Sequence, residues 1–118
     1  MSALIDELRN TEGVDIDGAL ERMGDSEELY ETILGMFLQD ENYEALKDAM
    51  EKGDDENSLG YAHTIKGMCG NLGLTKLFSY ADDMVETFRK NRNCDVKLLM
   101  TQITEEYTKI TGIISKYL

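Results

Sequence analysis

The sequence predicts an all-α protein, an antiparallel up-down-up-down four-helix bundle with short N-terminal helices capping one end. The chain of 118 residues contains no proline, and its apolar residues, 42% of the total, recur at three- and four-residue steps typical of amphipathic helices. Only short connections separate these periodic segments, so neighbouring helices must run antiparallel. We expect a single domain over residues 1–118, because a chain of this length forms one hydrophobic core.

Two short helices are predicted at the N-terminus. Residues 4–8 place three apolar side chains on one face, before a turn-prone segment at residues 10–13. Residues 14–24 contain a turn and a second short helix, for which Asp17 is the candidate N-cap. These pieces are too short to be members of the bundle, so we expect them to cover one of its ends.

Four longer amphipathic helices follow. The first begins at the capping-box pattern of residues 25–28 and ends before Gly53. The second covers about residues 55–72 and ends at Gly73, where a left-handed residue is usually needed. The third and fourth lie on either side of the polar segment at residues 91–95. Their apolar stripes predict a core of Leu29, Ile33, Met36, Phe37, Tyr43, Leu46, Met50, Tyr61, Ile65, Met68, Cys69, Leu72, Leu74, Leu77, Phe78, Ala81, Met84, Val85, Phe88, Val96, Leu99, Ile103, Tyr107, Ile110, Ile114 and Tyr117.

Charge and composition exclude several functions. With 24 acidic against 12 basic residues the net charge is −12, which disfavours nucleic-acid backbones and anionic membrane surfaces. Neither a signal peptide nor an apolar run long enough for a membrane span is present, so we expect a cytoplasmic protein. Cys69 and Cys94 have no metal-site spacing, a single histidine excludes a di-iron bundle, and no glycine-rich phosphate loop follows a strand. We therefore expect no cofactor and no metal.

The helix predicted near residues 58–73 holds the only histidine of the chain. On a helical wheel His63 lies almost opposite the apolar face, and Gly60, Gly67 and Gly70 line the stripe above and below it. A glycine inside a helix costs about 0.5 to 1 kcal/mol relative to alanine, so glycines on a solvent face indicate that another surface approaches closely. The pattern predicts that a partner delivers its reactive group to the imidazole of His63.

Lys66 follows His63 by three residues and lies within reach of the same site. An exposed neutral imidazole can accept a phosphoryl group, and a lysine ammonium can neutralise phosphoryl oxygens without reacting. An incidental surface histidine and an ordinary solvated lysine are the simpler interpretations. The glycine stripe together with Lys66 favours a phosphoryl site instead.

The segment Ala62-His-Thr-Ile-Lys-Gly67, followed by Gly70-Asn-Leu-Gly73, resembles the signature of histidine-containing phosphotransfer (HPt) domains. The resemblance covers about residues 13–118. It includes comparable upstream residues at Val14-Asp-Ile16, Ala19-Leu20, Glu28-Leu-Tyr30 and Phe37-Leu38.

The resemblance implies a role for each matching residue. His63 would be phosphorylated on Nε2, with Lys66 as the cation beside the phosphate. Gly67 would keep the space next to the imidazole open, and Gly73 would permit the turn into the next helix. Met68, Cys69 and Leu74 stand where the family often has smaller residues, which leaves packing details open.

These observations predict a phosphorelay carrier rather than an enzyme. His63 would take a phosphoryl group from the receiver domain of a hybrid histidine kinase and pass it to the receiver of a response regulator, which would supply Mg²⁺. We expect a monomer, with few carboxylates around His63 and most acidic residues on the far helices. Two alternatives remain, a phospho-accepting domain like that of chemotaxis kinases and a bundle that binds a receiver without transfer.

Overall fold

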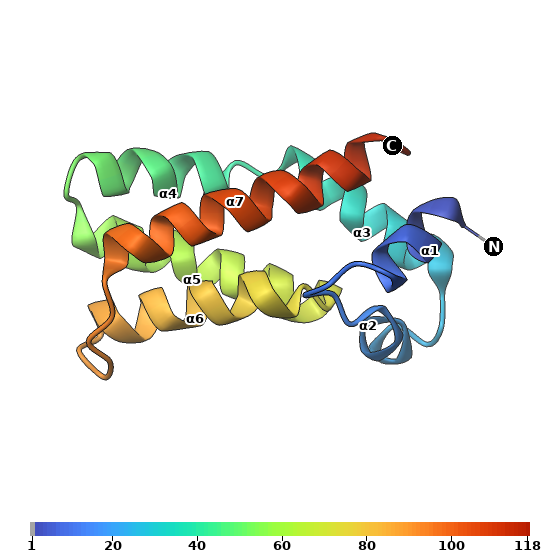
Figure 1. Cartoon of the computed structure of the whole chain (residues 1–118), viewed down its shortest axis with the longest axis horizontal. Coiled ribbons are helices and arrows are strands. Elements are labelled where there is room, and N and C mark those ends of the chain that lie inside the picture. Colours follow the sequence, from blue (N-terminus) through green and yellow to red (C-terminus); the bar gives the residue numbers. More distant parts are fainter. Residues whose placement is uncertain (1) are drawn as a thin grey trace.

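The computed structural model describes residues 2–118, and within that range all regular structure is α-helical. The helices are α1 (Ala3–Arg9), α2 (Ile16–Arg22), α3 (Glu27–Gln39), α4 (Asn42–Glu51), α5 (Asp55–Leu72), α6 (Thr75–Phe88) and α7 (Val96–Ser115), as labelled in Figure 1. The predicted all-α class is confirmed. Met1, the first residue of the predicted domain, lies outside the described residues. No helix in the described part of the chain is long and apolar enough to cross a membrane.

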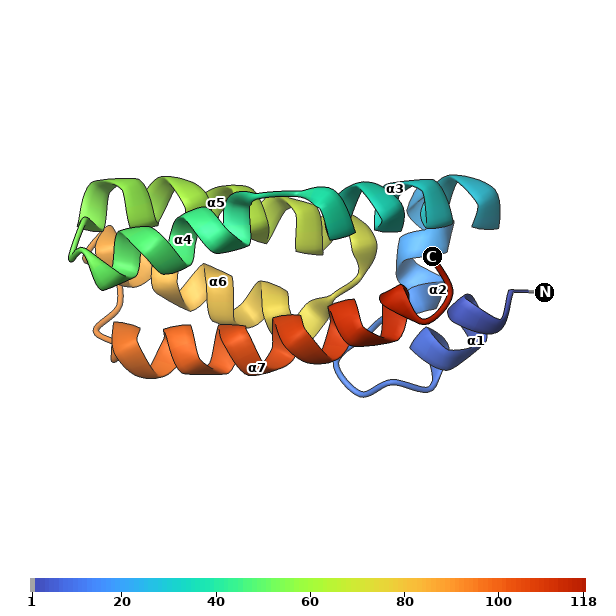
Figure 2. The same cartoon turned by 90° about the horizontal axis from the view of Figure 1, so that it is seen from above.

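The helices α4, α5, α6 and α7 lie side by side, and consecutive helices run in alternating directions (Figures 1 and 2). α5 packs against α4 on one side and α6 on the other, and α6 also packs against α7. The short helices α1 and α2 lie at the end where α3 and the C-terminus are found. Contacts of α1 with α7 and of α2 with α5 join this end to the longer helices.

One continuous helix was expected from residue 25 to residue 52, and this expectation is wrong. The chain breaks between α3 and α4, where Asp40 has an extended backbone with φ −71° and ψ 138°. The Asp40 carboxylate accepts a hydrogen bond from the backbone N–H of Asn42 at 2.8 Å. An aspartate side chain that binds a nearby backbone N–H competes with continuation of the helix, which explains the interruption.

Two helix caps differ from the prediction by one or two residues. Ser26, rather than Asp25, caps α3, because its hydroxyl accepts from the N–H of Leu29 at 3.1 Å. Asp15, rather than Asp17, caps α2, with its carboxylate 3.1 Å from the N–H of Gly18. In both cases the cap is the residue whose side chain accepts a hydrogen bond from the backbone N–H three residues later. Several adjacent polar residues could fill this role, so the sequence did not identify which one does.

Most of the predicted core is buried, but Leu29, Met36 and Tyr117 are exposed by 45%, 66% and 42%. In α3 the buried stripe is instead formed by Tyr30, Leu34 and Phe37. The break after α3 shifts the helical register, so a stripe extrapolated across it selects the wrong face. Tyr117 lies beyond the end of α7, and its hydroxyl donates to Glu7 on α1 at 2.6 Å.

Tyr30 connects α3 to the C-terminal end of α5. Its fully buried hydroxyl donates to the carbonyl oxygen of Leu72 at 2.6 Å, and burial raises the pKa of this hydroxyl. We expect Tyr30→Phe to lower the free energy of unfolding by about 1 to 3 kcal/mol, because the buried carbonyl of Leu72 loses its donor. Urea denaturation followed by circular dichroism measures this loss. An unchanged midpoint would show that water replaces the hydroxyl at no cost.

Candidate functional site

The helix α5 carries all of the predicted site residues. The Asp54 side chain caps its N-terminus through the N–H of Asn57 at 3.1 Å, and Gly73 ends it with φ 71° in the left-handed region. This agrees with the predicted bounds. The buried face consists of Ser58, Ala62, Ile65, Cys69 and Leu72.

Cys69 belongs to the hydrophobic core, as expected for a small apolar side chain in this position. Burial raises the pKa of its thiol to about 12, so the thiolate is disfavoured at neutral pH. Cys94 is half-buried, and both thiols are free. The thiol of Cys69 therefore provides no reactive group on the exposed face that carries His63.

His63 lies on the exposed face of α5. A Cβ atom placed on Gly60 or on Gly67 would meet no atom within 4 Å outside the local helix backbone. Packing inside the molecule therefore does not require glycine at either position. A Cβ atom at either position would extend into open space on the exposed face that also carries His63.

Gly70 has different surroundings from the other two glycines of the stripe. It is half-buried, and a Cβ atom there would lie 3.4 Å from the ring of Phe78 on α6. Its carbonyl oxygen accepts a hydrogen bond from the guanidinium of Arg22 on α2 at 2.7 Å. Gly70 therefore also serves the packing of α5 against α6 and α2, whereas Gly60 and Gly67 face open space.

Lys66 lies on the side of α5 that faces α6. Its Nζ is 2.9 Å from Oδ1 of Asp82 and 5.8 Å from the centre of the Phe78 ring. Oδ2 of Asp82 accepts from Arg92, in the segment between α6 and α7, at 2.8 Å. Arg92 also binds Asp83 at 2.9 Å. Hydrogen bonds first from Arg92 and then from Lys66 lower the pKa of Asp82, so Asp82 is a carboxylate at neutral pH.

Lys66 could be recognised from the sequence as a site residue, whereas Asp82 and Arg92 could not. The expected scarcity of carboxylates does not extend to the α6 side of the site, where Asp82 and Asp83 lie close to Lys66 and Arg92. These residues come from α6 and the following loop, and no local spacing rule brings them to α5. Their positions along the chain do not indicate that they form one network with Lys66.

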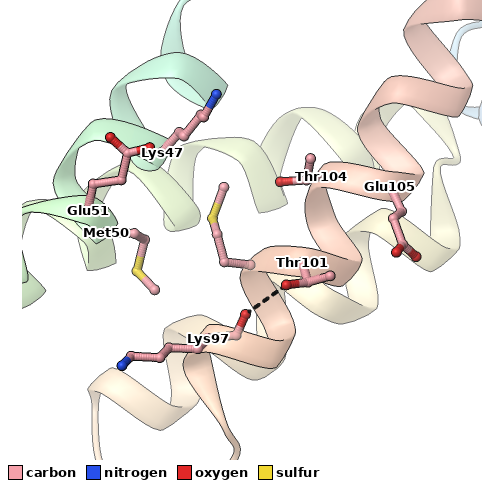
Figure 3. Close-up of a pocket in the computed structure, with 8 residues that line it drawn as sticks. Lys47, Met50, Glu51, Lys97, Thr101, Thr104 and Glu105 are labelled. Carbon is pink, nitrogen blue, oxygen red and sulfur yellow. Dashed lines mark hydrogen bonds between the residues drawn. The ribbon is translucent and has the colours of Figure 1, made fainter.

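The described residues contain no group of three or more histidine, cysteine or acidic side chains that could hold a metal ion. A groove lies between α4 and α7, lined by Lys47, Met50 and Glu51 on one side and by Lys97 and Thr101 on the other, and Figure 3 shows Met50 extending across it toward α7. None of the predicted site residues lines this groove. His63 therefore lies on an exposed helix face outside this groove.

The fold and the site define an all-helical protein that presents a single histidine on the exposed side of one helix, with a half-buried lysine three residues further along that helix. A family model of the Hpt domain matches residues 32–111, from within α3 to within α7. The chain belongs to the Hpt domain family, whose members act as phosphocarriers in two-component signalling and work with receiver domains. Comparisons with curated proteins and with solved structures returned no match.

Proposed function

We propose that this protein relays a phosphoryl group between the aspartates of two receiver domains through phospho-His63. One receiver belongs to a hybrid histidine kinase and the other to a response regulator. The observation that carries the proposal is the exposed His63 with open space at Gly60 and Gly67. Glycine at these positions weakens the helix and has no packing purpose, so close approach of a partner explains it.

The fold is consistent with this role. We propose an antiparallel up-down-up-down four-helix bundle in which α3 and α4 together form the first member and α1 and α2 cap one end. The alternating directions of α4 to α7 support this topology (Figure 1). The proposal takes residues 1–118 as one domain that acts as a monomer in the cytoplasm.

The histidine keeps its proton during the transfer step. The neutral imidazole attacks phosphorus through Nε2 while its proton stays on Nδ1. The bond between phosphorus and the aspartyl oxygen breaks as the new P–N bond forms, and the receiver aspartate leaves as a carboxylate. Return of the phosphoryl group to a second aspartate reverses these changes, so no water or further reactant is required.

Lys66 is the proposed cation for the phosphoryl oxygens in this step. It lies three residues from His63 on the same helix, so its ammonium can reach a group attached to the imidazole. Mg²⁺ would come from the acidic site of the receiver, and this chain needs no cofactor of its own. The histidine domain therefore supplies the nucleophile, the open surface and one positive charge.

Phosphoryl transfer from a radiolabelled receiver domain tests the proposal. We expect the wild-type protein to acquire label that is labile in acid and stable in base, and His63→Gln to acquire none. Circular dichroism of His63→Gln controls for folding, because the exposed side chain contributes little to stability.

Two other results would contradict the relay. Binding to a receiver with no label from any of several donors would indicate a bundle that binds without transfer. Label acquired from ATP through a separate kinase catalytic domain, and from no receiver, would indicate a phospho-accepting domain like that of chemotaxis kinases.

A further inference from the structure

Asp82 bridges two cations beside the proposed phosphorylation site. Each of its carboxylate oxygens accepts from a different partner, Oδ1 from Lys66 at 2.9 Å and Oδ2 from Arg92 at 2.8 Å. The side chains of Lys66 and Asp82 are only 26% and 23% exposed. This pair is therefore better shielded from solvent than an ordinary surface ion pair.

The position of Lys66 allows it to contact either Asp82 or a group on His63. Side chains three residues apart on a helix are neighbours, with Cβ atoms about 5 to 6 Å apart. The lysine stem is flexible, and its ammonium carries three donors. In the unphosphorylated protein the ammonium is committed to α6, where it also lies 5.8 Å from the Phe78 ring.

We propose that Asp82 is a positioning residue that competes with the phosphoryl group on His63 for the ammonium of Lys66. On phosphorylation, Lys66 exchanges the Asp82 carboxylate for a phosphoryl oxygen of higher negative charge. Arg92 makes this exchange feasible, because it keeps a hydrogen bond to Asp82 and does not leave a partly buried carboxylate unpaired. The inference rests on the proposed phosphorylation of His63, and it adds a residue that sets how readily the histidine is charged.

A small phosphoryl donor tests the competition without any receiver domain. With phosphoramidate, the bond between phosphorus and the donor nitrogen breaks as the bond to Nε2 of His63 forms. Ammonia leaves, and the imidazole keeps its proton on Nδ1. The rate of this reaction reports the effect of Lys66 and Asp82 on phosphorylation, independently of protein docking.

We expect Asp82→Asn to accept the phosphoryl group about twofold to tenfold faster than the wild-type protein, because a partly shielded ion pair no longer holds the ammonium of Lys66. The rise depends on the lysine, so Lys66→Met combined with Asp82→Asn is no faster than Lys66→Met alone. Asp83→Asn is the matched control, because Asp83 shares Arg92 but has no ion pair with Lys66. Its rate stays at the wild-type value.

An unchanged rate in Asp82→Asn, or an equal rise in the Lys66→Met background, would overturn the competition. Urea denaturation of each variant separates these results from a loss of folding. The two proposals fail in different ways. If the wild-type protein reacts with phosphoramidate at His63 but with no receiver, the relay proposal is wrong. The comparison of Asp82→Asn with Asp83→Asn then still tests the role of Asp82. Absence of reaction at His63 would overturn both.

Discussion

Replacing Gly73 by alanine is expected to lower the free energy of unfolding by about 3 to 5 kcal/mol, a large share of the 5 to 15 kcal/mol typical of a domain. Gly73 has φ 71°, where a Cβ atom costs about 1 to 2 kcal/mol. The added Cβ would also overlap the backbone carbonyl oxygen of Asp15 and lie 3.1 Å from Cβ of Ala19. The N–H of Asp15 donates to the carbonyl of Gly73 at 2.7 Å, so α2 would have to move away from α5.

Gly53→Ala provides the matched control for this prediction. Gly53 follows α4 with φ 69°, but a Cβ atom there would meet nothing within 4 Å. This variant therefore measures the cost of the backbone conformation alone, about 1 to 2 kcal/mol. Urea denaturation of both variants gives the contribution of the Asp15 contact by difference. Equal losses in the two variants would contradict a tight approach of α2 to the end of α5.

Gly67→Gln is expected to stabilise the protein and to reduce phosphoryl transfer from a receiver about 100-fold. Glutamine favours helix over glycine by about 0.5 to 1 kcal/mol, and a Cβ atom at Gly67 meets no other part of the molecule. A long side chain next to His63 would hold the receiver away from the imidazole. A displacement of about 1 Å in a transfer reaction can cost 100-fold in rate.

The control for this variant is Gly112→Gln on α7. Gly112 is also an exposed helical glycine whose Cβ would meet nothing within 4 Å. We expect a similar gain in stability and no change in transfer. Thermal denaturation and the receiver assay, run on both variants, separate the two effects. Transfer at the wild-type rate in Gly67→Gln would show that this position does not face the receiver.

The helix that carries the site could be predicted almost completely from the sequence. Its bounds, its cap at Gly73 and the exposure of His63 opposite a buried face follow from periodicity and from one left-handed residue. The region before it was less predictable. A local hydrogen bond at Asp40 broke the expected first helix, and the register of the buried stripe changed with it.

The sequence by itself determined the all-helical class, the candidate acceptor His63 and its glycine neighbours, because these depend on intervals of three and four residues along one helix. Only the tertiary structure decided which group the ammonium of Lys66 contacts. Its ion pair with Asp82 and the link from Asp82 to Arg92 join residues 16 and 10 positions apart along the chain. Such contacts depend on how α5 packs against α6, and local spacing carries no information about that packing.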